Sequence, residues 1–231
     1  MISLTESPHF SLWSAQRSLR VRPTPFSQEC PSRHRVDLPT SEAGYDGWRF
    51  ETFSPSVLHE VKKLNAALFP IAYRDSVYRQ ALACGAVSQV AVDAAGAVAG
   101  AVLCRLEAVP RPDDPDAAPT RARQYVVTVG VLEAYRGRGL GSLLMRRALD
   151  AGRAAGVESV PEAFLHVQAN ADAARRFYAR LGFRETGFLS GYYRRSMGVT
   201  GCLDARMLTC SFENNEGGCG GKEDAAETES H

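Results

Sequence analysis

The sequence contains no apolar run long enough to span a membrane and no Cys-x-x-Cys pair. It therefore predicts neither a transmembrane helix nor a zinc site or disulfide framework, and its six cysteines fit a reducing compartment. Two of them, Cys84 and Cys104, lie in apolar segments and are expected to be buried. Lysine is scarce, and the formal net charge is only +1, which excludes the strongly basic surface of a typical nucleic-acid-binding domain.

Both ends of the 231-residue chain differ in composition from its middle. Residues 1 to about 45 are rich in Ser and Arg and poor in acids, a pattern that resembles organelle transit peptides. The alternative is a disordered extension or a gene start assigned too far upstream. Residues 212–231 are Gly-rich and acidic, with too few apolar side chains to pack, and predict a disordered tail. One folded domain is therefore expected over residues 46–211.

The spacing of apolar residues within this domain predicts alternating groups of strands and helices. Strands are expected at 48–53, 87–92, 97–106, 125–131, 163–167, 183–186 and 206–211. Helices are expected at 57–68, 75–84, 139–155 and 170–181. Ser54 and Asn170 are candidate N-caps, and Gly182 ends the last helix. This order predicts an α/β fold in which helices pack against a sheet.

A glycine-rich turn, Arg136-Gly137-Arg138-Gly139-Leu140-Gly141, lies between the strand expected at 125–131 and the following helix. Such a turn points several backbone N–H groups and the positive end of the helix dipole at one spot, which makes an anion site. Glycines let the backbone approach the anion closely, and the two arginines add charge-assisted contacts. The sequence therefore predicts a phosphorylated cofactor here.

The spacing of this turn narrows the choice of cofactor. No Gly-Lys-Ser/Thr follows it, so it is not a Walker loop, and its alternating glycines do not form the G-x-G-x-x-G dinucleotide fingerprint. It resembles Arg/Gln-x-x-Gly-x-Gly/Ala, the pyrophosphate loop of the GCN5-related N-acetyltransferase (GNAT) superfamily, whose co-substrate is acetyl-CoA. Taken alone, an ordinary Gly-rich turn between a strand and a helix is the alternative.

Five further motifs, in the right order, are similar to the catalytic subunit of the NatE complex within that superfamily. They are residues 69–73 (Phe-Pro-Ile-Ala-Tyr), 125–128 (Tyr-Val-Val-Thr), 165–168 (Leu-His-Val-Gln), 177–178 (Phe-Tyr) and 192–193 (Tyr-Tyr). The resemblance implies the GNAT fold, a mixed but mostly antiparallel twisted sheet flanked by helices. It also implies an acyltransferase, without a metal, that moves acetyl from acetyl-CoA to the α-amino group of protein N-termini beginning with Met and an apolar residue.

The cofactor site implied by this resemblance combines the turn with its flanking elements. Its residues are Val129, Val131, Arg136, Gly137, Arg138, Gly139, Leu140, Gly141, Ser142, Asn170 and Tyr178. Tyr178 matches a tyrosine near the CoA sulfur, where it could donate a proton to the leaving thiolate; a packed helix aromatic is the alternative. The family's Asn at the start of that helix is Ala171 here, with Asn170 one residue earlier, which puts this side-chain contact in doubt.

The resemblance assigns the catalytic base to Tyr125 and His166, acting through an ordered water. A peptide α-amino group titrates near ~8, so a modest base is enough to neutralise it. His166 is flanked by Leu165 and Val167, and burial in such a strand favours the neutral, basic imidazole. Without the resemblance, a lone strand histidine is more often a packed core residue.

The amine substrate needs an apolar pocket, which the resemblance builds from aromatic and aliphatic side chains. They are Phe69, Pro70, Ile71, Tyr73, Val127, Tyr192 and Tyr193. Few acids lie among them, which suits an N-terminal Met better than a lysine-rich target. The alternative is that the Phe-Pro break only ends a helix and the tyrosine pair is a surface feature.

Two other functions stay open at this point. One is an acetyltransferase of the same fold that acts on lysine or a small amine; the other is a mainly structural subunit of a ribosome-associated acetyltransferase complex. The acidic tail offers no amphipathic membrane anchor, and no nucleic-acid partner is expected. The expected location is the cytoplasm, or the nucleus as well, and a plastid or mitochondrion if residues 1–45 are a true transit peptide.

Overall fold

A computed structural model of the protein describes residues 47–111, 113–114, 119–156, 160–193, 199 and 201–212. The leader predicted at 1–45 lies outside these residues, as does the predicted tail apart from Phe212. Phe212 is buried, and its backbone N–H donates to the Pro161 carbonyl at 2.8 Å, so the packed domain extends at least that far. In the part of the chain described, no helix has the length and apolarity needed to cross a bilayer.

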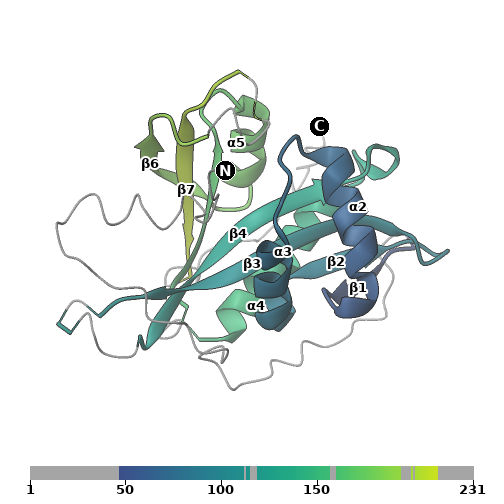
Figure 1. The fold of residues 1–231 in the computed structure, drawn as a ribbon, viewed down its shortest axis with the longest axis horizontal. Helices are drawn as coiled ribbons and strands as arrows, with labels where there is room; N and C mark the ends of the chain where they lie inside the picture. Colours follow the sequence, from purple (N-terminus) through teal and green to yellow (C-terminus); the bar gives the residue numbers. More distant parts are fainter. Residues whose placement is uncertain are drawn as a thin grey trace, which may run out of the picture.

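One seven-stranded sheet forms the centre of the protein (Figure 1). The strands are β1 (Arg49–Thr52), β2 (Gln89–Val92), β3 (Val98–Val109), β4 (Arg121–Val131), β5 (Glu162–Gln168), β6 (Arg184–Leu189) and β7 (Ala205–Ser211). They lie in the order β1-β2-β3-β4-β5-β7-β6, and every neighbouring pair is antiparallel except β4 and β5, which are parallel. The predicted mixed, mostly antiparallel sheet is confirmed.

Helices cover both faces of this sheet. They are η1 (Pro55–Val57), α2 (Leu58–Leu68), α3 (Asp75–Ala83), η2 (Gly85–Val87), η3 (Glu133–Tyr135), α4 (Leu140–Ala154) and α5 (Asp172–Ala179). Alternation along β3 divides the core: Leu103 packs with α2 and α3 on one face, while Val102 packs with α4 on the other. Figure 1 shows α2 and α3 in front of the strands, and β6, β7 and α5 set to one side.

Three local predictions were wrong, each because a turn closes differently. Val87 belongs to η2 rather than to a strand, since the Ser88 N–H returns to the Gly85 carbonyl at 3.0 Å. The Ser54 hydroxyl pairs with that of Ser56 at 2.7 Å instead of capping a helix. The N-cap of α5 is Ala171, not Asn170.

The sheet opens between its two parallel strands. β4 and β5 pair only at Gln124 with Ala163 and at Tyr125 with Phe164, and beyond these pairs the strands separate. A bulge in β4 lies at the same place, because Val126 pairs with Cys104 and Thr128 with Leu103, which leaves Val127 unpaired. The open space between β4 and β5 therefore starts beside Tyr125.

We expect a Gly100→Ala substitution to lower the free energy of unfolding by about 1–3 kcal/mol, the usual range for overpacking. A Cβ at Gly100 would lie 2.9 Å from the Gly130 carbonyl oxygen, a backbone atom of β4 that cannot rotate away. Urea denaturation measures the change. A Gly187→Ala variant, also in a strand and outside the left-handed region, would place its Cβ at an ordinary 3.4 Å from the Met207 side chain and separates crowding from a general effect of losing glycine. Equal midpoints for Gly100→Ala and the wild type would contradict the prediction.

Candidate active site

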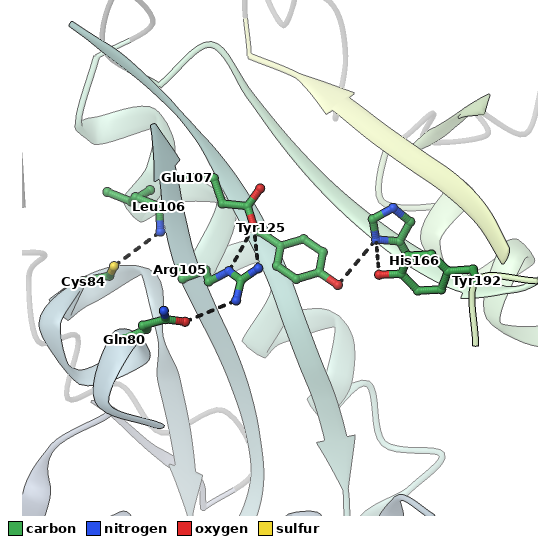
Figure 2. Close-up of polar contacts among 8 residues, drawn as sticks. All are labelled: Gln80, Cys84, Arg105, Leu106, Glu107, Tyr125, His166 and Tyr192. Carbon is green, nitrogen blue, oxygen red and sulfur yellow. Dashed lines mark hydrogen bonds and ion pairs between the residues drawn. The ribbon is translucent and has the colours of Figure 1, made fainter. Parts of the chain in front are cut away.

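Three polar side chains meet where the sheet opens (Figure 2). The Tyr125 hydroxyl of β4 lies 3.4 Å from His166 Nδ1 of β5, and the Tyr192 hydroxyl lies 3.2 Å from the same nitrogen. The imidazole also stacks on the Tyr192 ring, with centroids 4.6 Å apart. The structure thus brings the two predicted catalytic residues together and adds a tyrosine that the sequence assigned to substrate binding.

Burial fixes the protonation of the two phenols. Desolvation raises the pKa of Tyr125 to about 12, although a hydrogen bond from Tyr192 opposes the shift. Burial also raises the pKa of Tyr192 well above its ordinary value. Both phenols therefore keep their protons at neutral pH, and the single lone pair of His166 Nδ1 can accept from one of them, which is consistent with the tautomer that carries its proton on Nε2. His166 itself is half-buried rather than fully enclosed.

Arg105 completes the surroundings of Tyr125. It is the cross-strand partner of Tyr125, and its guanidinium carbon lies 4.9 Å from the centre of the phenol ring. Glu107 accepts from that guanidinium at 2.6 Å, and the Gln80 side-chain carbonyl of α3 accepts at 3.2 Å (Figure 2). Nothing in the sequence pattern pointed to Arg105, because its place on the ring depends on the β3–β4 register.

A pocket of about 510 Å³ lies along the last residues of β4, beyond the Val127 bulge, and reaches the start of α4. Its walls come from the end of α2, the last residues of β4, the glycine-rich turn, and one side of α5. From the predicted cofactor set it is lined by Val129, Val131, Arg136, Gly137, Gly139, Leu140, Gly141, Ser142 and Tyr178. Nine of the eleven predicted cofactor residues therefore surround one cavity.

The glycine-rich turn has the backbone geometry that an anion site requires. Gly137 and Gly139 have φ angles of 76° and 78°, in the left-handed region, and a Cβ at either position would meet nothing within 4 Å. Gly139 is the N-cap of the 15-residue helix α4, whose first-turn N–H groups face this end. The turn therefore offers open backbone donors and the positive end of a long helix dipole.

The two arginines of the turn do different things. The Arg136 Nε donates to the Val131 carbonyl at 3.0 Å, which holds that side chain at the pocket wall. The guanidinium carbon of Arg138 instead lies 4.7 Å from the centre of the Trp48 ring. Arg138 is not among the residues lining the pocket, so the prediction that its side chain reaches the cofactor is not supported.

The two cofactor residues predicted on and beside α5 differ in whether they line the pocket. Asn170 is exposed and is not among the pocket-lining residues, whereas Tyr178 lines the pocket and desolvation raises the pKa of its phenol to about 12. Arg180 and Phe177 also line the pocket, although neither was predicted. Arg180 lies two residues after Tyr178. Its closeness in sequence to a predicted cofactor residue was the signal that could have identified it as a cation near a phosphorylated ligand.

Aromatic rings gather beside the Tyr125–His166–Tyr192 cluster. Phe69 lines the pocket and stands edge-on to Tyr73, with centroids 5.9 Å apart, and Tyr193 stands edge-on to Tyr192 at 4.9 Å. Burial raises the pKa of Tyr73, and the nearby phenols of Tyr125 and Tyr193 add to the rise, so these rings share one apolar region.

The remaining residues of the predicted substrate set are less clearly placed. Pro70 is exposed, and Ile71 and Val127 are half-buried. Val127 is the bulged residue of β4. Among the residues that the structure describes, no group of three or more His, Cys, Asp and Glu side chains could hold a metal ion.

Several known proteins are similar to this chain in sequence. The profile of the acetyltransferase (GNAT) family matches residues 58–183. The chain is 31% identical over 142 residues to a probable N-acetyltransferase san of Drosophila melanogaster, a match that spans 62% of this chain and 71% of the relative. It is 30% identical over 142 residues to N-alpha-acetyltransferase 50 of Danio rerio, spanning 62% of this chain and 77% of the relative.

Solved structures show the same fold. Arabidopsis thaliana Naa50 in complex with the bisubstrate analogue CoA-Ac-MVNAL superposes with a TM-score of 0.61 at 31% identity, covering 72% of this chain and 99% of that one. Arabidopsis thaliana NAA60 in complex with acetyl-CoA has a TM-score of 0.60 at 23% identity, covering 71% and 99%. At 23% identity, the similarity to NAA60 supports the fold alone.

Proposed function

Because this chain belongs to the acetyltransferase (GNAT) family, we propose that it is an N-alpha-acetyltransferase that moves acetyl from acetyl-CoA to protein N-termini beginning with Met and an apolar residue. The observation that carries the proposal is the meeting of His166 and two protonated tyrosines where β4 and β5 separate, together with a pocket that follows β4 from Val129 to the glycine-rich turn. The Arabidopsis relative holds a bisubstrate analogue made of CoA and a peptide that starts with Met.

The residues of the pocket fit acetyl-CoA. The first-turn N–H groups of α4 and the open backbone at Gly137 and Gly139 suit the pyrophosphate, and Arg136 and Arg180 add positive charge along the wall. Val129 and Val131 also line the pocket, on the part of β4 that is separated from β5, where backbone groups can hold the pantetheine arm. Tyr178 lies on the same wall.

In the proposed reaction, acetyl-CoA supplies a thioester whose acetyl carbon bonds to the α-amino nitrogen. His166 Nδ1 takes up the proton that the nitrogen releases, relayed through an ordered water and the phenol hydroxyl that donates to Nδ1, because an imidazole takes up protons near neutral pH and the phenols only pass them on. The hydroxyls of Tyr125 and Tyr192 orient the imidazole and the water. The protonated Tyr178 phenol is the donor available to the departing thiolate.

The aromatic rings beside this cluster support the choice of peptide. The rings of Phe69 and Tyr73 contact each other, and Tyr193 contacts Tyr192, which stacks on His166. The guanidinium over Tyr125, that of Arg105, is paired with Glu107. An apolar Met side chain can fill such a site, whereas a lysine ammonium would lose its hydration without gaining a carboxylate partner.

A peptide panel tests the proposal. Release of CoA is measured with acetyl-CoA and three peptides: one with a Met-Leu N-terminus, one with a Ser N-terminus, and one with a blocked N-terminus and an internal lysine. We expect kcat/KM for Met-Leu to exceed the other two at least tenfold. Activity on the blocked lysine peptide alone would replace the proposal with a lysine acetyltransferase.

A substitution among these rings tests the peptide site separately from the pocket. We expect Tyr193→Ala to raise KM for the Met-Leu peptide about tenfold, since losing an apolar ring contact is worth about 1–3 kcal/mol, and to leave KM for acetyl-CoA unchanged. Phe188→Ala is the matched control, because this ring is 54% exposed on β6 and outside the site. An unchanged peptide KM in Tyr193→Ala would remove Tyr193 from the substrate site.

The location and partners of the protein follow from the family resemblance only. We propose a cytoplasmic enzyme, or one also present in the nucleus, that associates with a ribosome-bound acetyltransferase complex. Tagged full-length protein that does not sediment with ribosomes would contradict the association.

A further inference from the structure

Tyr135, the residue before the glycine-rich turn, is hydrogen-bonded to the hairpin between β2 and β3. The Tyr135 hydroxyl, just before the turn, donates to Asp93 Oδ2 at 2.8 Å. Asp93 stands in the β2–β3 turn, where its other oxygen accepts from the N–H groups of Ala95 at 3.0 Å and Ala97 at 2.8 Å. Tyr135 is thus held by a carboxylate that its own turn already immobilises.

The charge state of this pair is well defined. Hydrogen bonds from the Ala97 N–H and the Tyr135 hydroxyl hold the pKa of the Asp93 carboxyl below its ordinary value. The same bond raises the pKa of Tyr135, because a phenolate beside a carboxylate is unfavourable. A protonated phenol therefore donates to an ionised carboxylate, which is a charge-assisted hydrogen bond.

A second contact holds the middle of the turn. Trp48 is buried at the start of the sheet, and its ring stands edge-on to Tyr135 with centroids 5.1 Å apart. The Trp48 ring also contacts Arg138, whose guanidinium carbon lies over it, 4.7 Å from its centre. Trp48 therefore touches Tyr135, just before the turn, and Arg138, within it, one on each side of Gly137.

These contacts matter because glycines leave the turn free to change shape. Gly137 and Gly139 are both in the left-handed region and have open space around them, so little in the turn itself keeps its N–H groups pointed at one spot. Donors bind an anion well only when they are held in place before it arrives. Tyr135 also lines the pocket, so its position affects the ligand's surroundings directly.

We propose that Asp93–Tyr135 and Trp48–Arg138 form a clasp that holds the glycine-rich turn in its ligand-binding shape, so that Asp93, Trp48 and Tyr135 are positioning residues for CoA. The clasp rests on the proposed function only in taking CoA as the ligand. It also explains why the Arg138 side chain is directed to Trp48 while Arg136 stays at the pocket wall.

Calorimetric titration of the full-length protein with CoA tests the Asp93–Tyr135 bond without requiring catalysis. We expect Tyr135→Phe, which keeps the ring contact with Trp48, to weaken CoA binding about 5- to 10-fold, the effect of one charge-assisted hydrogen bond. Asp93→Ala should weaken it similarly, and the double variant should be no weaker than the worse single one. Asp93→Asn keeps the shape of the side chain but not its charge or its second acceptor oxygen, so it should recover only a small part of the affinity.

The matched control is Tyr78→Phe. This buried tyrosine of α3 accepts a hydrogen bond from Asn65 at 3.4 Å, away from the pocket, so its loss can lower stability without touching CoA binding. In steady-state assays the clasp variants should raise KM for acetyl-CoA and leave the peptide KM unchanged.

Three results would overturn the clasp. If Tyr135→Phe lowers Tm as Tyr78→Phe does but binds CoA like the wild type, the bond is only structural and the proposed function stands. If the effects of Tyr135→Phe and Asp93→Ala simply add, the two residues do not act through their bond. Failure of the wild type itself to bind CoA would remove both the clasp and the proposed function.

Discussion

Replacing His166 by alanine is expected to lower kcat at pH 7 about 100-fold, the lower end of what a positioned proton acceptor contributes, without changing CoA binding. The imidazole is the group of the Tyr125–His166–Tyr192 cluster that can accept a proton near neutral pH. The variant should regain part of its rate as the pH rises, since more of the peptide amine is then neutral without help. Steady-state rates between pH 6 and 9 measure both effects.

The control for this variant is His59→Ala, because His59 is an exposed histidine on α2. Tyr125→Phe should reduce kcat less, by about tenfold, since the imidazole keeps its contact with Tyr192. Desolvation raises the pKa of Tyr125 to about 12, so no titration of this phenol is expected in the rate profile below pH 9. Wild-type kcat in a folded His166→Ala protein would show that the proton leaves by another route.

The features predictable from the sequence are those set by neighbours in the chain. The turn at 136–141 can be predicted because glycine readily adopts the left-handed backbone that Gly137 and Gly139 have. The strands β4 and β5 follow from short apolar runs, and their order along the chain fixes the fold class. His166 and Tyr125 could be paired only through the family resemblance, since 41 residues separate them.

The features missed by the sequence depend on register and on distant contacts. Arg105 stacks on Tyr125 only because the strands pair at those residues, and the Val127 bulge shifts the pairing on either side of it. Arg138 was expected at a phosphate because it lies in the turn, but Trp48, 90 positions away, offers its ring. No pattern among neighbouring residues predicts the contact between Arg138 and Trp48.

A Gly139→Val substitution is expected to weaken CoA binding about 5- to 30-fold. Gly139 is the N-cap of α4 at a φ of 78°, and a side chain there costs about 1–2 kcal/mol in the left-handed region. The turn can avoid that strain by changing shape, and CoA binding must then restore the strained shape. Each 1.4 kcal/mol corresponds to a factor of ten in affinity, which sets the expected size. Calorimetry with CoA measures it.

The other end of the same helix supplies the control. Gly156 follows α4, has a φ of 89°, and, like Gly139, would place a Cβ where nothing lies within 4 Å. Gly156→Val should therefore lose similar stability in urea while binding CoA like the wild type. If both variants weaken CoA binding equally, the loss comes from a destabilised helix and not from the turn. A loss confined to Gly139→Val ties affinity to the backbone shape at the start of α4.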